Sequence, residues 1–186
     1  MVRHATYIKP NGIQYRVTNM FHGICGFFSL FLIWGLVLNL SEGVSLFSMI
    51  HILILLLLTL AGTFYRDTWI FNKQDQIITS IYGFGPLCRR EQFTFSEVHQ
   101  LELTHFVRGT TDKDAKPTKR RFRAMIVFSL SLGENDTRDI EIIAEKTSAG
   151  RTESAVQAIS AVTGLPLYVD RPRDLDLHVS YKDMKW

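Results

Sequence analysis

Cysteine is scarce in this sequence, and so is charge in its first third. The 186 residues include only two cysteines, Cys25 and Cys88. Two thiols on different predicted elements do not make a disulfide framework, and we expect both to stay reduced in a cytoplasmic compartment. Residues 1–65 carry three Lys or Arg and one acid, whereas the rest of the chain is nearly balanced, for a net charge of +3. This balance excludes a general polyanion binder, so we expect no nucleic-acid partner.

Sequence motifs of the common enzyme classes are also missing. The chain has no G-x-S-x-G nucleophile elbow. Gly83 and Gly85 lack the third glycine and the following helical pattern of a nucleotide fingerprint. His99 and His105 lie on one predicted strand and would be about 20 Å apart, too far to share one metal ion. We therefore expect a protein that is not an enzyme and needs no cofactor or metal.

Two long apolar runs are the strongest positive signal in the sequence. They cover residues 21–40 and 44–64, and the second contains ILILLLL at 52–58. Each is about the 20 residues that a helix needs to cross roughly 30 Å of hydrocarbon. The first run is longer than the apolar part of a signal peptide and a second run follows at once, so we interpret it as a retained anchor. The sequence predicts a transmembrane hairpin over residues 20–65.

The charges that flank the two runs predict their orientation. The connecting loop at 39–45 contains Glu42 and no base, whereas bases flank the other ends of the runs: Arg3, Lys9, Arg16, Arg66 and Lys73. Basic flanks stay on the cytoplasmic side of a membrane. We therefore predict an integral membrane protein with both termini in the cytoplasm.

Polar and small residues within the hairpin are candidate intramembrane contacts. His22 and His51 lie near the starts of the two runs, where an ionisable group is either functional or reaches the headgroups. Gly23 and Gly26, with Cys25, Ser29 and Gly35, place small residues on the first run. Such residues allow either close packing within the hairpin or docking of a partner helix.

From residue 68 onward the pattern changes to short alternating runs. These predict six antiparallel strands, at 68–72, 76–82, 91–95, 100–107, 122–132 and 137–144. Helical spacing at 151–163 predicts an amphipathic helix with Gly164 as its C-cap. We predict an α+β domain over 66–169, in which the helix caps a bent antiparallel sheet or barrel. Residues 1–19 would form an N-terminal cytoplasmic segment, and residues 170–186 a partly ordered tail.

Turn motifs in this domain carry a family resemblance. They are WIFNK at 69–73, FSEV at 95–98, GEND at 133–136 and GLPL at 164–167. With the two apolar runs, they resemble bacterial two-transmembrane-helix proteins that have a cytoplasmic pleckstrin-homology-like domain. The layout is also similar to the two-helix photosystem I assembly factor family, with a nearest motif match at 84–86 before a basic pair. The resemblance implies a pleckstrin-like (PH-like) sheet domain, a role in assembling a membrane complex, and the bacterial inner membrane as the location.

Two basic clusters are the candidate contacts to an anionic surface. They comprise Arg89, Arg90, Lys119, Arg120, Arg121 and Arg123. Near a membrane, each base contributes roughly 1 kcal/mol of attraction to anionic lipids. The alternative is a solvated rim of loops, balanced by nearby acids.

These patterns favour a non-enzymatic interaction module anchored in the membrane. We predict a subunit or assembly factor of a membrane protein complex that also contacts membrane lipids. The alternative function is binding or sensing of anionic lipid headgroups at the membrane surface.

Overall fold

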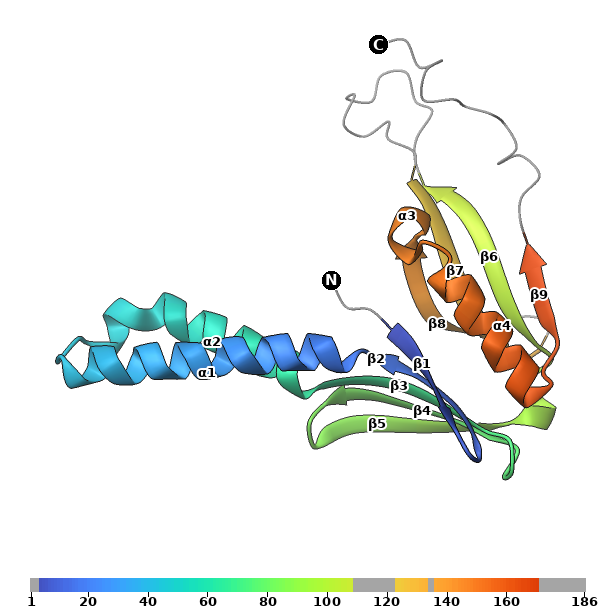
Figure 1. Cartoon of the computed structure of the whole chain (residues 1–186), viewed down its shortest axis with the longest axis horizontal. Coiled ribbons are helices and arrows are strands. Elements are labelled where there is room, and N and C mark those ends of the chain that lie inside the picture. Colours follow the sequence, from blue (N-terminus) through green and yellow to red (C-terminus); the bar gives the residue numbers. More distant parts are fainter. Residues whose placement is uncertain (1–3, 109–122, 134–135, 171–186) are drawn as a thin grey trace, which may run out of the picture. The chain divides into compact units, whose positions relative to one another are not determined.

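A computed structural model describes residues 4–108, 123–133 and 136–170 of the chain. Within these ranges the chain forms nine strands and four α-helices, joined in places by short 3-10 turns. It divides into two compact units, Met1–Gln92 and Phe93–Trp186. Each unit combines one β-sheet with helices (Figure 1).

The first unit contains the apolar hairpin. Helix α1 covers Asn19–Ser41, and α2 covers Ile50–Phe64 after a 3-10 turn at Leu46–Met49. Both helical segments, Asn19–Ser41 and Leu46–Phe64, are long and apolar enough to cross a membrane. Only 11% and 6% of their apolar windows are buried, unlike the core helices of a soluble protein. The two predicted apolar helices are confirmed, with ends shifted by a few residues.

The hairpin is inserted into a five-stranded antiparallel sheet. Its strands, in spatial order, are β1 (His4–Lys9), β2 (Gly12–Val17), β3 (Tyr65–Asn72), β4 (Ile77–Phe84) and β5 (Leu87–Thr94). Strand β2 leads into α1, α2 leads into β3, and β2 and β3 pair side by side. Both ends of the hairpin therefore emerge at the same place, which we call the foot of the hairpin. The predicted N-terminal segment contributes β1 and β2, where the sequence analysis expected no strand.

One face of this sheet carries its buried side chains. Register places Ile13 beside Phe71 and Tyr15 beside Trp69, and Phe71 pairs onward with Ile78 on β4. Gly12 has a φ of +156° and a Cβ there would collide with the backbone carbonyl of Phe71. Glycine is therefore required where β2 begins, because the neighbouring strand approaches closely.

The second unit is a four-stranded sheet with a helix on one face. Its strands, in spatial order, are β8 (Thr137–Ala144), β7 (Arg123–Ser131), β6 (Gln100–Arg108) and β9 (Leu167–Asp170). Strand β9 runs parallel to β6, and the other pairs are antiparallel. Helix α4 (Arg151–Thr163), which follows the short α3 (Glu145–Ser148), contacts β6, β7 and β9 (Figure 1). The fully buried Val156 and Ile159 on α4 anchor the helix in this unit.

Much of the predicted secondary structure is confirmed. Helix α4 has the predicted bounds, and Gly164 caps it in the left-handed conformation with its N–H bonded to the Ser160 carbonyl at 2.8 Å. The predicted barrel is wrong for the described residues, whose strands form two open sheets. A 3-10 turn at Phe95–Glu97, closed by a capping box with Thr94, separates β5 from β6 and interrupts strand pairing there. A further strand, β9, which the sequence analysis did not predict, joins β6 in parallel.

Candidate functional site

An open cleft of about 470 Å³ lies at the foot of the hairpin. It is formed by the outer face of β1–β4 together with the first turn of α1 and the last turn of α2. Its polar lining consists of Lys9, Gln14, Arg16, Asn19, His22, Thr63, Tyr65, Arg66, Asp67 and Thr68. The cleft therefore belongs wholly to the first unit.

Strand register brings the bases of the cleft together. Side chains alternate along β2, so Arg16 points away from the face that buries Tyr15 and Val17. Arg16 pairs with Thr68 on β3, and Arg66 shares the face of Thr68 two residues earlier. Two arginines that are distant in sequence thus become diagonal neighbours because the hairpin closes between their strands.

The cleft has an excess of positive charge. Within the described part of the chain, Lys9, Arg16 and Arg66 form no ion pair. The one acid of the lining is Asp67, whose Oδ2 lies 3.2 Å from Nε2 of His4. The carboxylate is therefore engaged with His4, and it neutralises none of the three bases.

Arg16 is held in place although its charge is not paired. Its guanidinium carbon lies 4.4 Å from the centre of the Tyr7 ring, which is a cation–π contact. Its Nε is buried and finds no hydrogen-bond acceptor among the described residues. A buried donor without an acceptor is rare in folded proteins.

Tyr65 marks the junction between α2 and β3. Its hydroxyl donates to Oδ2 of Asp67 at 3.4 Å. Burial, and then the nearby charge of Asp67, raise the pKa of the Tyr65 hydroxyl above its usual value of 10.0. Tyr65 therefore stays a neutral hydrogen-bond donor across the physiological pH range.

The structure separates the four predicted intramembrane contacts. His22 lines the cleft, and its Nδ1 lies 3.1 Å from the carbonyl oxygen of Thr63. A Cβ added at Gly26 would lie 3.8 Å from the methyl carbon of Thr63. An added Cβ at Gly23 would meet nothing within 4 Å, and His51 is exposed at the start of α2. The first pair joins the two helices, whereas the second pair makes no such contact.

Cys25 and Ser29 of α1 make close contacts with Gly62 and Thr59 of α2, two residues that the sequence analysis did not select. An added Cβ at Gly62 would lie 2.8 Å from Sγ of Cys25. The buried Ser29 hydroxyl lies 3.0 Å from the Thr59 hydroxyl. Small residues on both helices thus permit a close approach that hydroxyl contacts reinforce.

Of the predicted basic clusters, Arg89 and Arg90 lie outside the cleft lining. Arg89 and Arg90 are exposed on β5, and Nη2 of Arg89 lies 2.8 Å from Oε1 of Glu91. Arg123 is the first residue of β7, and residues 119–121, which include Lys119, Arg120 and Arg121, lie outside the described residues. Contact between these residues and an anionic surface stays a prediction.

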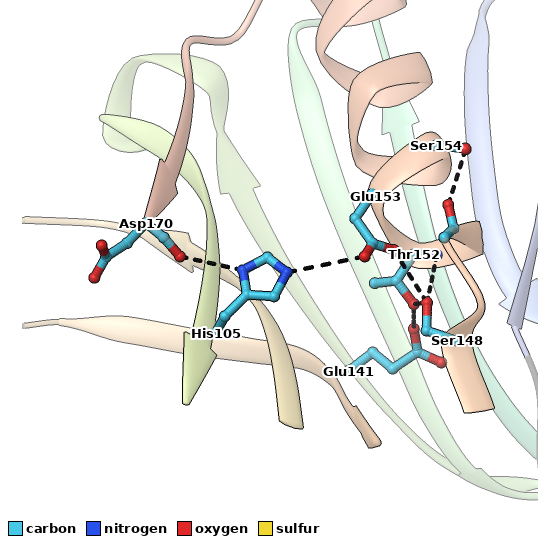
Figure 2. A network of polar contacts seen from close by, with 8 residues as sticks. His105, Glu141, Ser148, Thr152, Glu153, Ser154 and Asp170 are labelled. Atoms are coloured by element: carbon cyan, nitrogen blue, oxygen red, sulfur yellow. Dashed lines mark hydrogen bonds and ion pairs between the residues drawn. The ribbon is translucent and has the colours of Figure 1, made fainter. Parts of the chain in front are cut away.

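A second polar cluster lies beneath α4, and its side chains contact one another (Figure 2). His105 on β6 is buried, with Nδ1 3.1 Å from the Asp170 carbonyl and Nε2 3.8 Å from Oε1 of Glu153. Ser148 contacts Glu153 at 3.1 Å and Thr152 at 3.0 Å, and the Thr152 hydroxyl donates to Glu141. Each of these side chains has a partner within the cluster, which joins α3 and α4 to the strands.

Comparisons with protein-family models, with curated proteins and with solved structures found no match to this chain. The two family resemblances inferred from turn motifs are therefore not supported by any of these comparisons. The coarser description holds: two long apolar helices combined with antiparallel sheets and a C-terminal helix. Neither a pleckstrin-like identity nor an assembly-factor identity follows from it.

Proposed function

We propose that this protein is a membrane-anchored, non-enzymatic module that binds anionic lipid headgroups in the cleft at the foot of the hairpin. The observation that carries the proposal is a pair of bases, Arg16 and Arg66, that form no ion pair among the described residues and lie where two apolar helices end, with Lys9 further along the same cleft lining. This is the lipid-binding alternative from the sequence, moved from the predicted basic clusters to a different set of residues.

The length of α1 supports a position of the cleft at the depth of the lipid headgroups. The 23 residues of α1 extend about 35 Å at 1.5 Å per residue, against roughly 30 Å of hydrocarbon. The first turn of α1, with Asn19 and His22, would therefore extend into the headgroup layer. Since the opposite end of the hairpin carries Glu42 and no base, the foot belongs on the cytoplasmic side, and so do both termini.

The chemistry of the cleft suits a phosphate group. A guanidinium binds phosphate oxygens through two parallel hydrogen bonds, and Arg16 is already oriented by Tyr7. The first turn of α1 contains no acid and Thr18 does not cap it through its side chain, so the helix dipole also favours an anion there. Each base near the surface adds roughly 1 kcal/mol of attraction to anionic lipids.

The role predicted first from the sequence, a subunit or assembly factor of a membrane complex, is a second candidate. The observation that favours it is the open space beside Gly23 and Gly35, where an added Cβ would meet nothing within 4 Å. A partner helix fits beside small residues that the hairpin itself leaves uncovered. The pleckstrin-like form of the sheet domain, which the resemblance implies, stays part of this second candidate.

Native mass spectrometry of the full-length protein in mild detergent tests both candidates. The protein is exchanged into equal amounts of phosphatidylglycerol and phosphatidylcholine before release. We expect the wild type to retain phosphatidylglycerol, and the double variant Arg16→Gln, Arg66→Gln to lose most of it. The matched control is Lys73→Gln, Lys146→Gln, which removes the same charge from exposed residues outside the cleft lining and should retain as much lipid as the wild type.

Equal retention by the wild type and the cleft variant would overturn lipid binding in the cleft. Retention should also weaken as salt is raised, because the attraction is screened. A stoichiometric protein that stays bound after salt treatment would instead support the subunit role.

A further inference from the structure

The turn between β4 and β5 lies beside the end of α2. Its Gly85 N–H donates to the Phe64 carbonyl, the last residue of α2, at 2.8 Å. The rings of Tyr65 and Phe84 are 5.5 Å apart. These contacts fix the turn at the same depth as the end of the second apolar helix.

The tip of this turn is apolar and exposed. Leu87 is 83% exposed and Phe84 is 51% exposed, next to Phe64 at 57%. Gly85 adopts a φ of +52° and is followed by Pro86, so a two-residue turn holds the tip rigidly. A leucine this exposed contributes little to the core of the sheet, and its apolar surface remains to be explained.

We propose that the β4–β5 turn is a second membrane contact, in which Phe84 and Leu87 insert into the boundary between headgroups and acyl chains. The bilayer is the one that the hairpin crosses, so the inference rests on the membrane anchor of the proposed function. The occupant follows from continuity, because the turn is hydrogen-bonded to Phe64 at the end of an apolar span. Phe and Leu are among the side chains with which surface-bound segments insert at this boundary.

Insertion of the turn gives Arg89 and Arg90 a defined relation to the membrane. They follow Leu87 by two and three residues, which is about 7–10 Å along a strand. Long basic side chains cover such distances and place their charge among the headgroups. Two attachments, the hairpin and the turn, would then hold the sheet at one tilt and keep the cleft at headgroup depth.

Spin-label depth measurements on the full-length protein test this proposal. Single cysteines at Leu87, Ile8 and Leu30 are introduced into the Cys25→Ala, Cys88→Ser background, labelled with a nitroxide and reconstituted into phosphatidylglycerol and phosphatidylcholine vesicles. Collision rates with oxygen and with a water-soluble nickel chelate report the depth of each label. Ile8 is the matched control, because it is 77% exposed on the same sheet but at the end away from the foot.

We expect the Leu87 label to be shielded from the nickel chelate, the Ile8 label to be fully accessible, and the Leu30 label on α1 to lie deepest. A Leu87 label as accessible as the Ile8 label, with Leu30 still deep, would overturn the turn contact and leave the anchor intact. An accessible Leu30 label would overturn both the anchor and the turn contact. Lipid retention in the cleft is measured separately by native mass spectrometry. Absence of that retention would overturn lipid binding in the cleft without affecting the depth measured for the Leu87 and Leu30 labels.

Discussion

Polar side chains beneath α4 contact one another, whereas the bases at the foot of the hairpin form no ion pair with any residue that the structure describes. In the second unit, His105 meets Glu153 and the Asp170 carbonyl, and the chain of contacts continues through Ser148 and Thr152. In the first unit, Arg16 and its neighbouring bases face an open cleft. Buried polar groups are normally satisfied, so a closed cluster indicates a structural role and an open one indicates a place for a ligand.

The helices of the two units differ in the same way. Helix α4 is amphipathic and buries Val156 and Ile159. Helices α1 and α2 are apolar on all sides and leave most of their surface uncovered. An amphipathic helix is complete once its apolar stripe is covered, whereas a helix that is apolar all round needs an apolar solvent. In the second unit the apolar stripe of α4 is covered by the protein itself, whereas the apolar surfaces of α1 and α2 in the first unit need an apolar environment outside the protein.

The largest expected effect is on the core of the second unit. Ile159→Ala should lower the free energy of unfolding by about 3 kcal/mol, because it leaves a cavity under α4. Gln157→Ala, on the exposed side of the same helix, is the matched control and should change little. Chemical denaturation in detergent, followed by circular dichroism, measures both. Equal effects would mean that α4 is not held through this face.

A somewhat smaller effect is expected where the hairpin helices touch. Gly62→Val should destabilise the hairpin by about 1–3 kcal/mol, because the new side chain overlaps Sγ of Cys25. Gly23→Val adds the same atoms where nothing lies within 4 Å and should leave the thermal midpoint unchanged. Thermal unfolding in detergent separates the two. Loss of a co-purifying protein in Gly23→Val alone would instead mark that side of α1 as a partner surface.

The closed and open clusters should respond oppositely to truncation. His105→Ala should cost about 1–3 kcal/mol of stability and leave lipid retention unchanged, because Glu153 loses a buried partner. Arg16→Gln should cost under about 1 kcal/mol, the value of its stacking on Tyr7, and should reduce retention of phosphatidylglycerol. Unfolding and native mass spectrometry on both variants provide the test. Loss of lipid retention in His105→Ala, with unchanged retention in Arg16→Gln, would contradict the roles assigned to the two clusters.

The smallest expected effect concerns alkaline pH. The pKa of Tyr65 is raised in the folded protein, so the folded state holds this proton more tightly than the unfolded state. The resulting stability is present below the unfolded value of 10.0 and is lost as pH rises through the higher folded value. Unfolding measured from pH 8 upward should show this loss in the wild type, and a smaller loss in Tyr65→Phe. An identical pH profile for both would exclude Tyr65 as the source.

Local sequence patterns sufficed where the structure depends on neighbours in the chain. The two apolar helices and α4 follow from composition and from the 3.6-residue period, and Gly164 caps α4 because only glycine adopts that conformation freely. The hairpin strands β3 and β4 follow from alternation around a polar turn. Strands β1 and β2 also carried a signal, the Asn11-Gly12 turn beside the alternating Ile13, Tyr15 and Val17, which the sequence analysis did not use.

The sequence by itself determined that this chain has an apolar hairpin, strand-rich regions and a capped amphipathic helix, because short-range periodicity specifies each of these. Only the tertiary structure decided that β2 pairs with β3 across the hairpin, which places Arg16 and Arg66 in one cleft. It alone also decided that His105 meets Glu153 and the end of β9. Pairing between distant segments depends on strand register and on closure of the chain between them, and neither can be predicted from short-range residue periodicity.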